Sequence, residues 1–280
     1  MLNKDKKHNP DDQVYFDFPQ KDDFDFTLIE NVLTGKRCGA ILTSVFSPEV
    51  CKIVAENFSK KTQLSQRTDG AQGDIWGTYH YGKTLQEYLS KANDYQHKLT
   101  EIFDGTTNLH AELIAKIQQG LQLKGADIRL AEHENQLAAP FVIRRWKGSG
   151  DYSLPPHEDG AQLSAPEQKK FEIQEARKYN LCAVNICLEN TEQAKSIVWS
   201  TKPTQRDRES HNTIPHGHSY PKKIFEGANS VQILMQPGDI YVFNANHLHA
   251  VLIGPNKSGN RLMLSFFMSI IKPQTIIFWS

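Results

Sequence analysis

The first half of the chain has the hydrophobic pattern of amphipathic helices. Apolar residues recur at three- and four-residue spacing after Ser47, a good N-cap that is followed by proline and glutamate. Further helical patterns cover residues 83–103 and about 110–123, and the second one ends near Gly125, a common residue after a helix end. We therefore expect residues 26–125 to be mainly helical.

Two segments of this half do not follow the helical period. Residues 1–25 mix acidic, basic and aromatic residues without a period, which predicts a loose N-terminal arm. The segment GAQGDIWGTYHYG (70–82) is rich in glycine and aromatic residues. This composition favours either an ordered functional loop or a short hairpin.

After about residue 126 the pattern changes to short apolar runs between turn residues. The runs are PFVIRRW, LCAVNICLE, SIVWS, SVQILM, DIYVFN, HAVLIG, RLMLSFFMSI and TIIFWS. Short strands at such intervals predict an antiparallel barrel or a double-sheet jelly roll over residues 126–280. The polar segment 201–223 is too long for a hairpin turn and is either a disordered insert or a lid over the mouth of the barrel.

The two halves together predict an α+β fold in a single domain over residues 26–280. Its core is a jelly roll, the cupin-like double-stranded β-helix, and the N-terminal helices pack outside it. The charged N-terminus lacks an apolar signal region, and the run at 262–271 is too short for a membrane span. We therefore expect a cytoplasmic protein.

Composition narrows the range of partners. Lysine plus arginine number 32, as do aspartate plus glutamate, so the charge balance gives no reason to expect nucleic acid or a membrane surface as a partner. The four cysteines have no CxxC spacing and predict buried thiols in a reducing compartment. A small molecule is therefore the expected partner.

The segment PPHEDG contains three consecutive polar residues, His157, Glu158 and Asp159. Alternate side chains of an extended segment share one face, so His157 and Asp159 point the same way. Glu158 points away, to solvent or to groups behind the site. The His157–Asp159 pair can hold a divalent metal if the fold supplies a third ligand.

The later segment FNANHLHAVLIG offers His247 and His249 as that third ligand. They are two residues apart, so periodicity does not choose between them. Two histidines and one carboxylate with three open positions suit a non-haem Fe(II) site. Arg261 opens the next apolar strand, where burial of its guanidinium requires an anionic partner such as a carboxylate.

These features resemble the Fe(II)- and 2-oxoglutarate-dependent oxygenases. That family has an HxD motif, a long gap, a histidine, and an arginine about a dozen residues further on, within a double-stranded β-helix core. PPHEDG, PGDIYVFNANHLHAV and GNRLMLSFF match this pattern in order and context. The resemblance covers about residues 126–280.

The resemblance assigns roles to the candidate residues. His249 lies 12 residues before Arg261 and precedes Ala-Val, so it matches the histidine of the family better than His247 does. The resemblance implies that Fe(II) is bound by His157, Asp159 and His249. Arg261 would then bind the distal carboxylate of 2-oxoglutarate, with O2 as cosubstrate.

The chain as a whole is also similar to the carrier-protein-independent halogenases that act on indole alkaloids. The shared pieces are the helical N-terminal half, the loop around DIWG, the IRRW strand before the metal loop and the terminal FWS. Those halogenases have glycine where this chain has Asp159, and the vacancy holds chloride. With Asp159 present, the resemblance implies a hydroxylase.

Several other residues are candidates for ligand contacts. Arg144 and Arg145 are adjacent in a strand, so one of them faces inward, where it could meet a carboxylate of the substrate or cosubstrate. The alternative is that both form solvated salt bridges at the sheet edge. Asn244 lies in an apolar strand and could contact the cosubstrate. Aromatic residues that could line the substrate entrance, or simply pack their glycine-rich loop, are Trp76, Tyr79 and Tyr81.

The sequence therefore predicts a dioxygenase that hydroxylates an unactivated C–H bond of a free small molecule and converts 2-oxoglutarate to succinate and CO2. A non-redox, cupin-like module for sugar binding or isomerisation is the alternative, although it does not need Arg261. Desaturation uses the same ligands as hydroxylation, so the pattern does not separate the two reactions. Neither the substrate nor the oligomeric state follows from these motifs.

Overall fold

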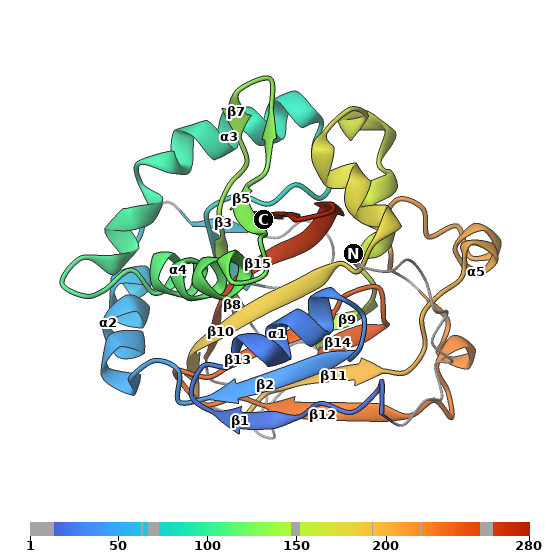
Figure 1. The fold of residues 1–280 in the computed structure, drawn as a ribbon, viewed down its shortest axis with the longest axis horizontal. Helices are drawn as coiled ribbons and strands as arrows, with labels where there is room; N and C mark the ends of the chain where they lie inside the picture. The colour runs from blue at the N-terminus through green and yellow to red at the C-terminus, as the bar shows by residue number, and fades with distance from the viewer. Residues whose placement is uncertain are drawn as a thin grey trace.

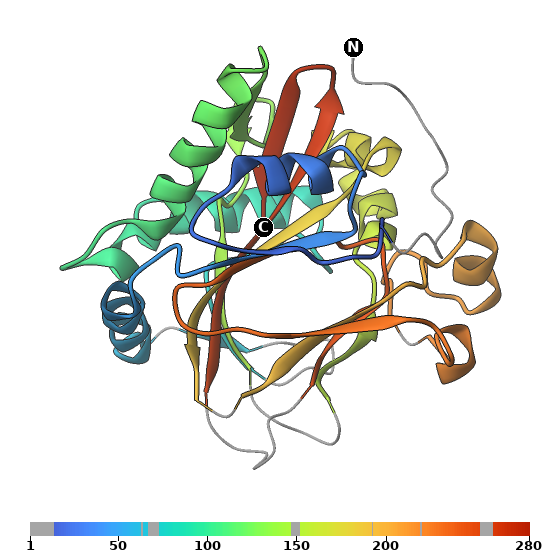
Figure 2. The same ribbon diagram turned by 60° about the horizontal axis from the view of Figure 1, so that its bottom comes forward.

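The computed structural model describes residues 14–280 apart from positions 63, 67–72, 147–151, 192, 219 and 253–259. Within this part of the chain, two large β-sheets face each other, and helices cover the outside of the larger sheet (Figure 1 and Figure 2). This arrangement is the predicted α+β fold with a jelly-roll core.

The larger sheet has ten strands in the order β1-β2-β13-β10-β15-β8-β4-β3, with β16 beside β15 and β5 beside β16. Its strands are β1 (Gln20–Asp22), β2 (Gly39–Thr43), β3 (Ser65–Gln66), β4 (Gly73–Trp76), β5 (Asp127–Leu130), β8 (Val142–Trp146), β10 (Cys182–Asn190), β13 (Ile240–Asn244), β15 (Arg261–Lys272) and β16 (Thr275–Trp279). Pairing is antiparallel except for β1 with β2 and β5 with β16.

The smaller sheet has four strands in the order β12-β11-β14-β9. They are β9 (Tyr152–His157), β11 (Lys195–Trp199), β12 (Ser230–Leu234) and β14 (His249–Leu252), and a separate hairpin joins β6 (Glu132–His133) to β7 (Gln136–Leu137). All eight apolar runs noted in the sequence form strands, namely β8 and β10 to β16.

The helices lie mainly on the outer face of the larger sheet (Figure 1). The α-helices are α1 (Phe26–Leu33), α2 (Pro48–Ser59), α3 (Leu85–Gln96), α4 (Leu109–Gln122) and α5 (Gln205–Ser210). Short 3-10 helices are η1 (Leu99–Phe103), η2 (Gly160–Ser164), η3 (Pro166–Gln168), η4 (Glu172–Lys178) and η5 (Lys222–Ile224). The predicted cap of α2 is confirmed, because the Ser47 hydroxyl accepts the amide of Val50 at 3.3 Å.

Strand β10 shows how the larger sheet separates two layers. Val184 and Ile186 pack outward in one cluster with Phe58 of α2, which is fully buried. Ala183 and Asn185 alternate with them and face the interior between the sheets. Burial of one side chain such as Phe58 contributes roughly 1.5–3 kcal/mol, so the outward residues hold the helices in place. The inward residues are free to line a cavity.

Residues 26–125 contain α1 to α4, as expected for a mainly helical segment, together with three short strands, β2, β3 and β4, of which β2 was not expected. Strand β2 lies between β1 and β13 in the larger sheet. Its five residues, GAILT, are too few to show a clear period of two. Gly39 is required there, because a Cβ at this position would lie 2.1 Å from the ring of Phe18.

The aromatic residues of the N-terminal segment are packed against the core from residue 15 onward, in contrast to the loose arm expected for residues 1–25. Tyr15, Phe16 and Phe18 are each less than 10% exposed, at 7%, 8% and 9%. Their aromatic surface is large enough to fix an aperiodic segment against β2 and the loop before β14. Residues 1–13 lie outside the described residues.

The structure also bears on the expectations for the cysteines, for a membrane span and for the polar segment 201–223. All four cysteines are buried and unpaired, as expected from their spacing. Among the described residues, no helix combines the length and apolar character that crossing a membrane requires. The polar segment 201–223 contains α5 and the start of η5, so it is not the disordered insert that was one of two alternatives.

Candidate metal centre

Two histidines face each other where β9 and β14 pair at the mouth of the jelly roll. His157 is the last residue of β9, His249 is the first residue of β14, and the antiparallel register places them directly opposite. Their ring centroids are 4.1 Å apart. The sheet register therefore brings together two side chains that are 92 positions apart in the sequence.

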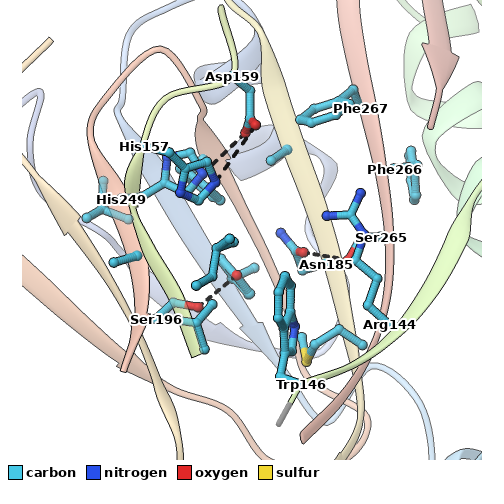
Figure 3. A pocket seen from close by; sticks show the side chains of 18 of the residues that line it. Arg144, Trp146, His157, Asp159, Asn185, Ser196, His249, Ser265, Phe266 and Phe267 are labelled. Carbon is cyan, nitrogen blue, oxygen red and sulfur yellow. Dashed lines mark hydrogen bonds and ion pairs between the residues drawn. The ribbon is translucent and has the colours of Figure 1, made fainter. Parts of the chain in front are cut away.

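Asp159 completes the group from the turn that follows β9. Its Oδ2 lies 3.2 Å from His249 Nε2, and its Oδ1 lies 3.9 Å from His157 Nε2 (Figure 3). One donor atom from each of the three residues lies within 4.8 Å of the others, and all three residues are buried. Two imidazoles and one carboxylate at this spacing suit a divalent transition metal with several open positions.

Backbone carbonyls orient both histidine rings. His157 Nδ1 lies 2.8 Å from the Pro155 carbonyl, and His249 Nδ1 lies 2.8 Å from the His247 carbonyl. A carbonyl oxygen only accepts, so each Nδ1 must carry the proton and donate it. In the neutral imidazole each Nε2 then carries no proton, and this atom, which is directed at the Asp159 carboxylate, is the one available to bind a metal.

Asp159 is held as an ionised carboxylate. Burial raises the pKa of Asp159, but its contacts with the His249 and His157 imidazoles and the nearby Arg144 guanidinium lower it further, to about 2 overall. Its amide donates to the Ala245 carbonyl at 2.9 Å, and its Oδ1 accepts from Gln162 Nε2 at 3.0 Å. These bonds fix both the backbone and the side chain of the third candidate ligand.

An inner cavity extends between the sheets from the metal ligands to Arg261. Arg261 is 3% exposed, and its Nη2 donates to Ser196 Oγ at 2.8 Å. Ser196 Oγ also lies 2.8 Å from the Tyr241 hydroxyl. Arg261 Nε and Nη1 have no hydrogen-bond partner among the described residues, which is costly for a buried guanidinium. An anionic ligand in the cavity would satisfy both atoms.

An outer cavity of about 250 Å³ lies on the other side of the metal ligands. Apolar residues and tyrosines form much of its wall, and the residues with polar groups include His80, Gln162 and His218. The two cavities share five lining residues, which are Arg144, Leu154, His157, Asp159 and Phe267. The candidate metal centre therefore lies where the two cavities meet.

The structure settles which arginine of β8 faces inward. Arg144 lines both cavities. Arg145 points the other way, where its Nη2 donates to Ser59 Oγ at 2.8 Å and its guanidinium carbon lies 4.8 Å from the ring centroid of Phe58. The alternation expected for adjacent strand residues thus holds, and only Arg144 can contact a ligand in the cavities.

Glu158 is not the solvent-exposed neighbour that the period of two allowed, because its side chain is fully buried behind the metal loop. Arg208 of the 201–223 segment donates two hydrogen bonds to it, from Nε and Nη2, each at 3.0 Å. The Tyr220 hydroxyl donates to Oε1 at 3.1 Å, and the Ala161 amide donates to Oε2 at 3.0 Å. Glu158, which lies between two candidate metal ligands, therefore anchors the polar segment to the loop that carries them.

This anchored segment contributes to the outer cavity. The Glu158 amide donates to the Gly217 carbonyl at 2.7 Å, and His218 forms an isolated β-bridge with His157. His218 and Tyr220 line the outer cavity, and His218 Nε2 lies 2.7 Å from the Tyr81 hydroxyl. The arrangement agrees with the lid alternative for residues 201–223.

Replacing Arg208 with alanine should destabilise the protein by about 3–5 kcal/mol, because the fully buried Glu158 carboxylate would lose its cationic partner. Urea denaturation of the metal-free protein measures this change in the free energy of unfolding. Arg206→Ala, an exposed position of the same helix, should change it by less than about 0.5 kcal/mol. Equal effects of the two substitutions would contradict the anchoring role.

Two candidates from the sequence, Asn244 and Trp76, lie outside the cavities. Asn244 does not reach either cavity, because its amide group donates to Tyr15 Oη at 3.3 Å and Asn180 Oδ1 at 2.9 Å. Trp76 packs edge-on against Tyr95 in the outer core, whereas Tyr79 and Tyr81 do line the outer cavity. These outcomes reflect side-chain direction, which the sequence alone did not give.

His247 is not among the grouped ligand atoms. Its Nε2 lies 3.0 Å from the Tyr15 hydroxyl, its Nδ1 lies 3.1 Å from the Trp199 carbonyl, and its own carbonyl accepts from His249. Burial lowers the pKa of His247 to about 4, so the ring is neutral near neutral pH. His247 therefore supports the candidate ligand His249 from behind.

A jelly roll with two histidines and an aspartate at its mouth, and a buried arginine deeper between its sheets, places this chain in the superfamily of Fe(II)- and 2-oxoglutarate-dependent oxygenases. More specifically, the chain belongs to the family described as carrier-protein-independent halogenase WelO5, whose family model matches residues 16–280.

Individual relatives agree with this assignment. The L-isoleucine 3(1)-dioxygenase of Pantoea ananatis (strain AJ13355) is 26% identical over 267 residues, which cover 91% of this chain and 89% of the relative. An N-substituted L-amino acid dioxygenase from Burkholderia ambifaria AMMD has a similar structure, with a TM-score of 0.55, 13% identity and 91% of each chain covered. Its complex with alpha-KG gives a TM-score of 0.51 at 12% identity, covering 91% of this chain and 90% of the other. At such identities the structural matches establish the fold.

Proposed function

We propose that this protein is an Fe(II)/2-oxoglutarate-dependent dioxygenase that hydroxylates an unactivated C–H bond of a free small molecule. The observation that carries the proposal is the buried group of His157, Asp159 and His249, with two imidazoles and one carboxylate aimed at a common point. Three protein ligands would leave three positions of an octahedral ion for cosubstrate and O2.

The residues of the inner cavity fit 2-oxoglutarate. Its distal carboxylate would accept hydrogen bonds from Arg261, whose Nε and Nη1 have no partner among the described residues, and from the Ser196–Tyr241 hydroxyl pair. When bound, iron and 2-oxoglutarate supply the oxidation: one oxygen atom of O2 enters succinate, the other enters the substrate C–H bond, and CO2 is released. The protein positions both reactants and keeps water out.

Asp159 favours hydroxylation over halogenation in this chain. The family resemblance places glycine at this position in the halogenases, where the missing carboxylate leaves room for chloride. Here the carboxylate is buried, ionised, hydrogen-bonded by Gln162 and in contact with His249. A halide therefore has no open protein position to take up, and transfer of a hydroxyl group is the reaction that this ligand set supports.

The size of the outer cavity and the relatives suggest where to look for the substrate. A cavity of about 250 Å³ is below the range of roughly 300–1,000 Å³ that is typical for drug-sized ligands. The relatives described above are named as dioxygenases of L-isoleucine and of N-substituted L-amino acids. We propose aliphatic amino acids and their derivatives as the first compounds to assay.

Anaerobic addition of Fe(II) and 2-oxoglutarate to the metal-free protein tests the metal and cosubstrate assignments. A weak visible charge-transfer band is expected when the keto acid chelates the metal, and Arg145→Met should not change it. The same proteins with O2 and aliphatic L-amino acids should form succinate together with a product that has gained one oxygen atom. A folded protein without the band would favour the non-redox jelly-roll alternative.

A further inference from the structure

His80 is a buried histidine of the outer cavity that the proposed function does not use. It lies in the loop between β4 and α3 and is 2% exposed. Its ring packs edge-on against the rings of Tyr88 and Phe267, at centroid distances of 6.3 and 6.2 Å, and its amide donates to the Ser280 backbone oxygen at 3.0 Å. Because Phe267 lines both cavities, His80 is fixed against a residue that borders the candidate metal centre.

Gln168 fixes which nitrogen of the His80 ring carries the proton. The Gln168 side-chain nitrogen donates to the His80 carbonyl at 2.6 Å and to the Lys83 carbonyl at 2.9 Å. These two acceptors use both N–H groups of the amide, so the remaining polar atom, Oε1, is the acceptor that lies 3.1 Å from His80 Nδ1. His80 Nδ1 must therefore carry the proton and donate it to Gln168.

The other ring nitrogen of His80, Nε2, is left as a hydrogen-bond acceptor. Burial lowers the pKa of His80 to about 4, so the ring is neutral near neutral pH and Nε2 has a lone pair. Nε2 has no hydrogen-bond partner among the described residues, yet it is not one of the nitrogens that are sealed inside the protein. Because His80 lines the outer cavity and is otherwise buried, this lone pair opens into that cavity.

Neither the cosubstrate nor the metal accounts for this acceptor. Ionised 2-oxoglutarate has no hydrogen-bond donor, and His80 does not line the inner cavity assigned to it. His80 is also outside the group of candidate metal ligands found among the described residues. When a substrate displaces water from the outer cavity, an unpaired Nε2 would cost roughly 1–3 kcal/mol. A substrate with a matching donor avoids that cost.

Building on the proposed function, we propose that His80 is a substrate-binding residue whose Nε2 accepts a hydrogen bond from an N–H or O–H group of the substrate. A site built around such a polar partner rejects analogues that lack the donor, so His80 would determine specificity. By fixing one end of the substrate, the same bond would also determine which C–H bond lies beside the candidate metal centre.

The test uses the Fe(II)–2-oxoglutarate complex and three matched probes, which are L-isoleucine, its 2-hydroxy analogue and the analogue with hydrogen in place of the amino group. Binding is followed anaerobically by the change that each probe causes in the charge-transfer band. Relative to the hydrogen analogue, the wild-type protein should bind the probe with the matching donor more tightly, by at least about 10-fold for the charged amino group or about 5-fold for the hydroxyl. Equal affinity for all three probes would overturn the proposal.

Two substitutions separate the cavity nitrogen of His80 from the nitrogen that contacts Gln168. Asparagine can keep the hydrogen bond to Gln168 but has no acceptor at the Nε2 position, so His80→Asn should reduce the preference to less than about 2-fold. The longer glutamine side chain can place its amide oxygen near the Nε2 position, so His80→Gln should restore part of the preference. His97→Asn, at an exposed position after α3, should behave as wild type.

The outcomes separate a binding role from a structural one, and this proposal from the proposed function. If His80→Asn weakens all three probes by the same factor, His80 only supports the cavity wall and the proposal is overturned. It is also overturned if the band forms but no probe changes it, whereas the metal and cosubstrate assignments then stand. If no band forms in the folded wild-type protein, it is the proposed function that fails.

Discussion

Replacing Asp159 with glycine is expected to reduce the rate of hydroxylation by at least about 100-fold. Mutation of residues that only hydrogen-bond to a metal ligand already lowers metal affinity or activity by roughly 10- to 100-fold, and Asp159 is itself a candidate ligand. The substitution removes the one carboxylate that the two histidines face. The backbone should tolerate it, since Asp159 has φ −95° and ψ −15°, which glycine adopts readily. The loss would therefore report on the metal site and not on folding.

The measurement is the ratio of hydroxylated product to succinate, with circular dichroism as the check on folding. Some succinate can still form in Asp159→Gly if the two histidines retain part of the metal. Assays with and without chloride then ask whether the vacated position accepts a halide, as the family resemblance suggests. Full hydroxylation by this variant would show that Asp159 is not a metal ligand.

Much of the fold could be predicted because the apolar runs of the jelly roll are separated by clear turn residues. Runs such as LCAVNICLE are apolar on both faces, since β10 contacts helices on one side and the inter-sheet space on the other. Strand β2 was missed because five residues inside a helical region carry little signal. The packing of Phe18 beside it depends on a tertiary contact with Gly39 that no local pattern encodes.

The candidate metal ligands could be predicted because side chains that bind one metal must share a face, and this requirement restricts their spacing in the sequence. Alternation separated His157 and Asp159 from Glu158, and the distance to Arg261 favoured His249. The structure places all three candidate ligands together.

The supporting residues could not be predicted in the same way. Ser196 and Tyr241 are single polar residues in strands that face Arg261 only after the two sheets have been assembled. Glu158 was expected to point away, and it does, but no local pattern indicated that Arg208, 50 positions later, would pair with it. Such partners follow from sheet register and from where a long segment packs, and neither is visible in a single sequence.

Replacing Arg261 with alanine should raise the concentration of 2-oxoglutarate needed for half-maximal turnover by at least about 30-fold, because loss of one partner of a buried, hydrogen-bonded charge pair costs 2–5 kcal/mol. Ser196→Ala is the graded comparison, since it removes one hydroxyl that contacts Arg261 and leaves the guanidinium in place. Its effect should be smaller, about 10-fold. Steady-state rates measured against 2-oxoglutarate give both values.

The pattern across the kinetic constants decides what Arg261 does. A residue that holds only the distal end of the cosubstrate should raise the 2-oxoglutarate requirement far more than it lowers the maximal rate, while the substrate requirement stays near the wild-type value. Because Arg261 Nε and Nη1 have no partner among the described residues, alanine leaves no protein group newly unpaired at those atoms. An unchanged 2-oxoglutarate requirement would therefore mean that the buried guanidinium stabilises the packing of the two sheets and does not bind the cosubstrate.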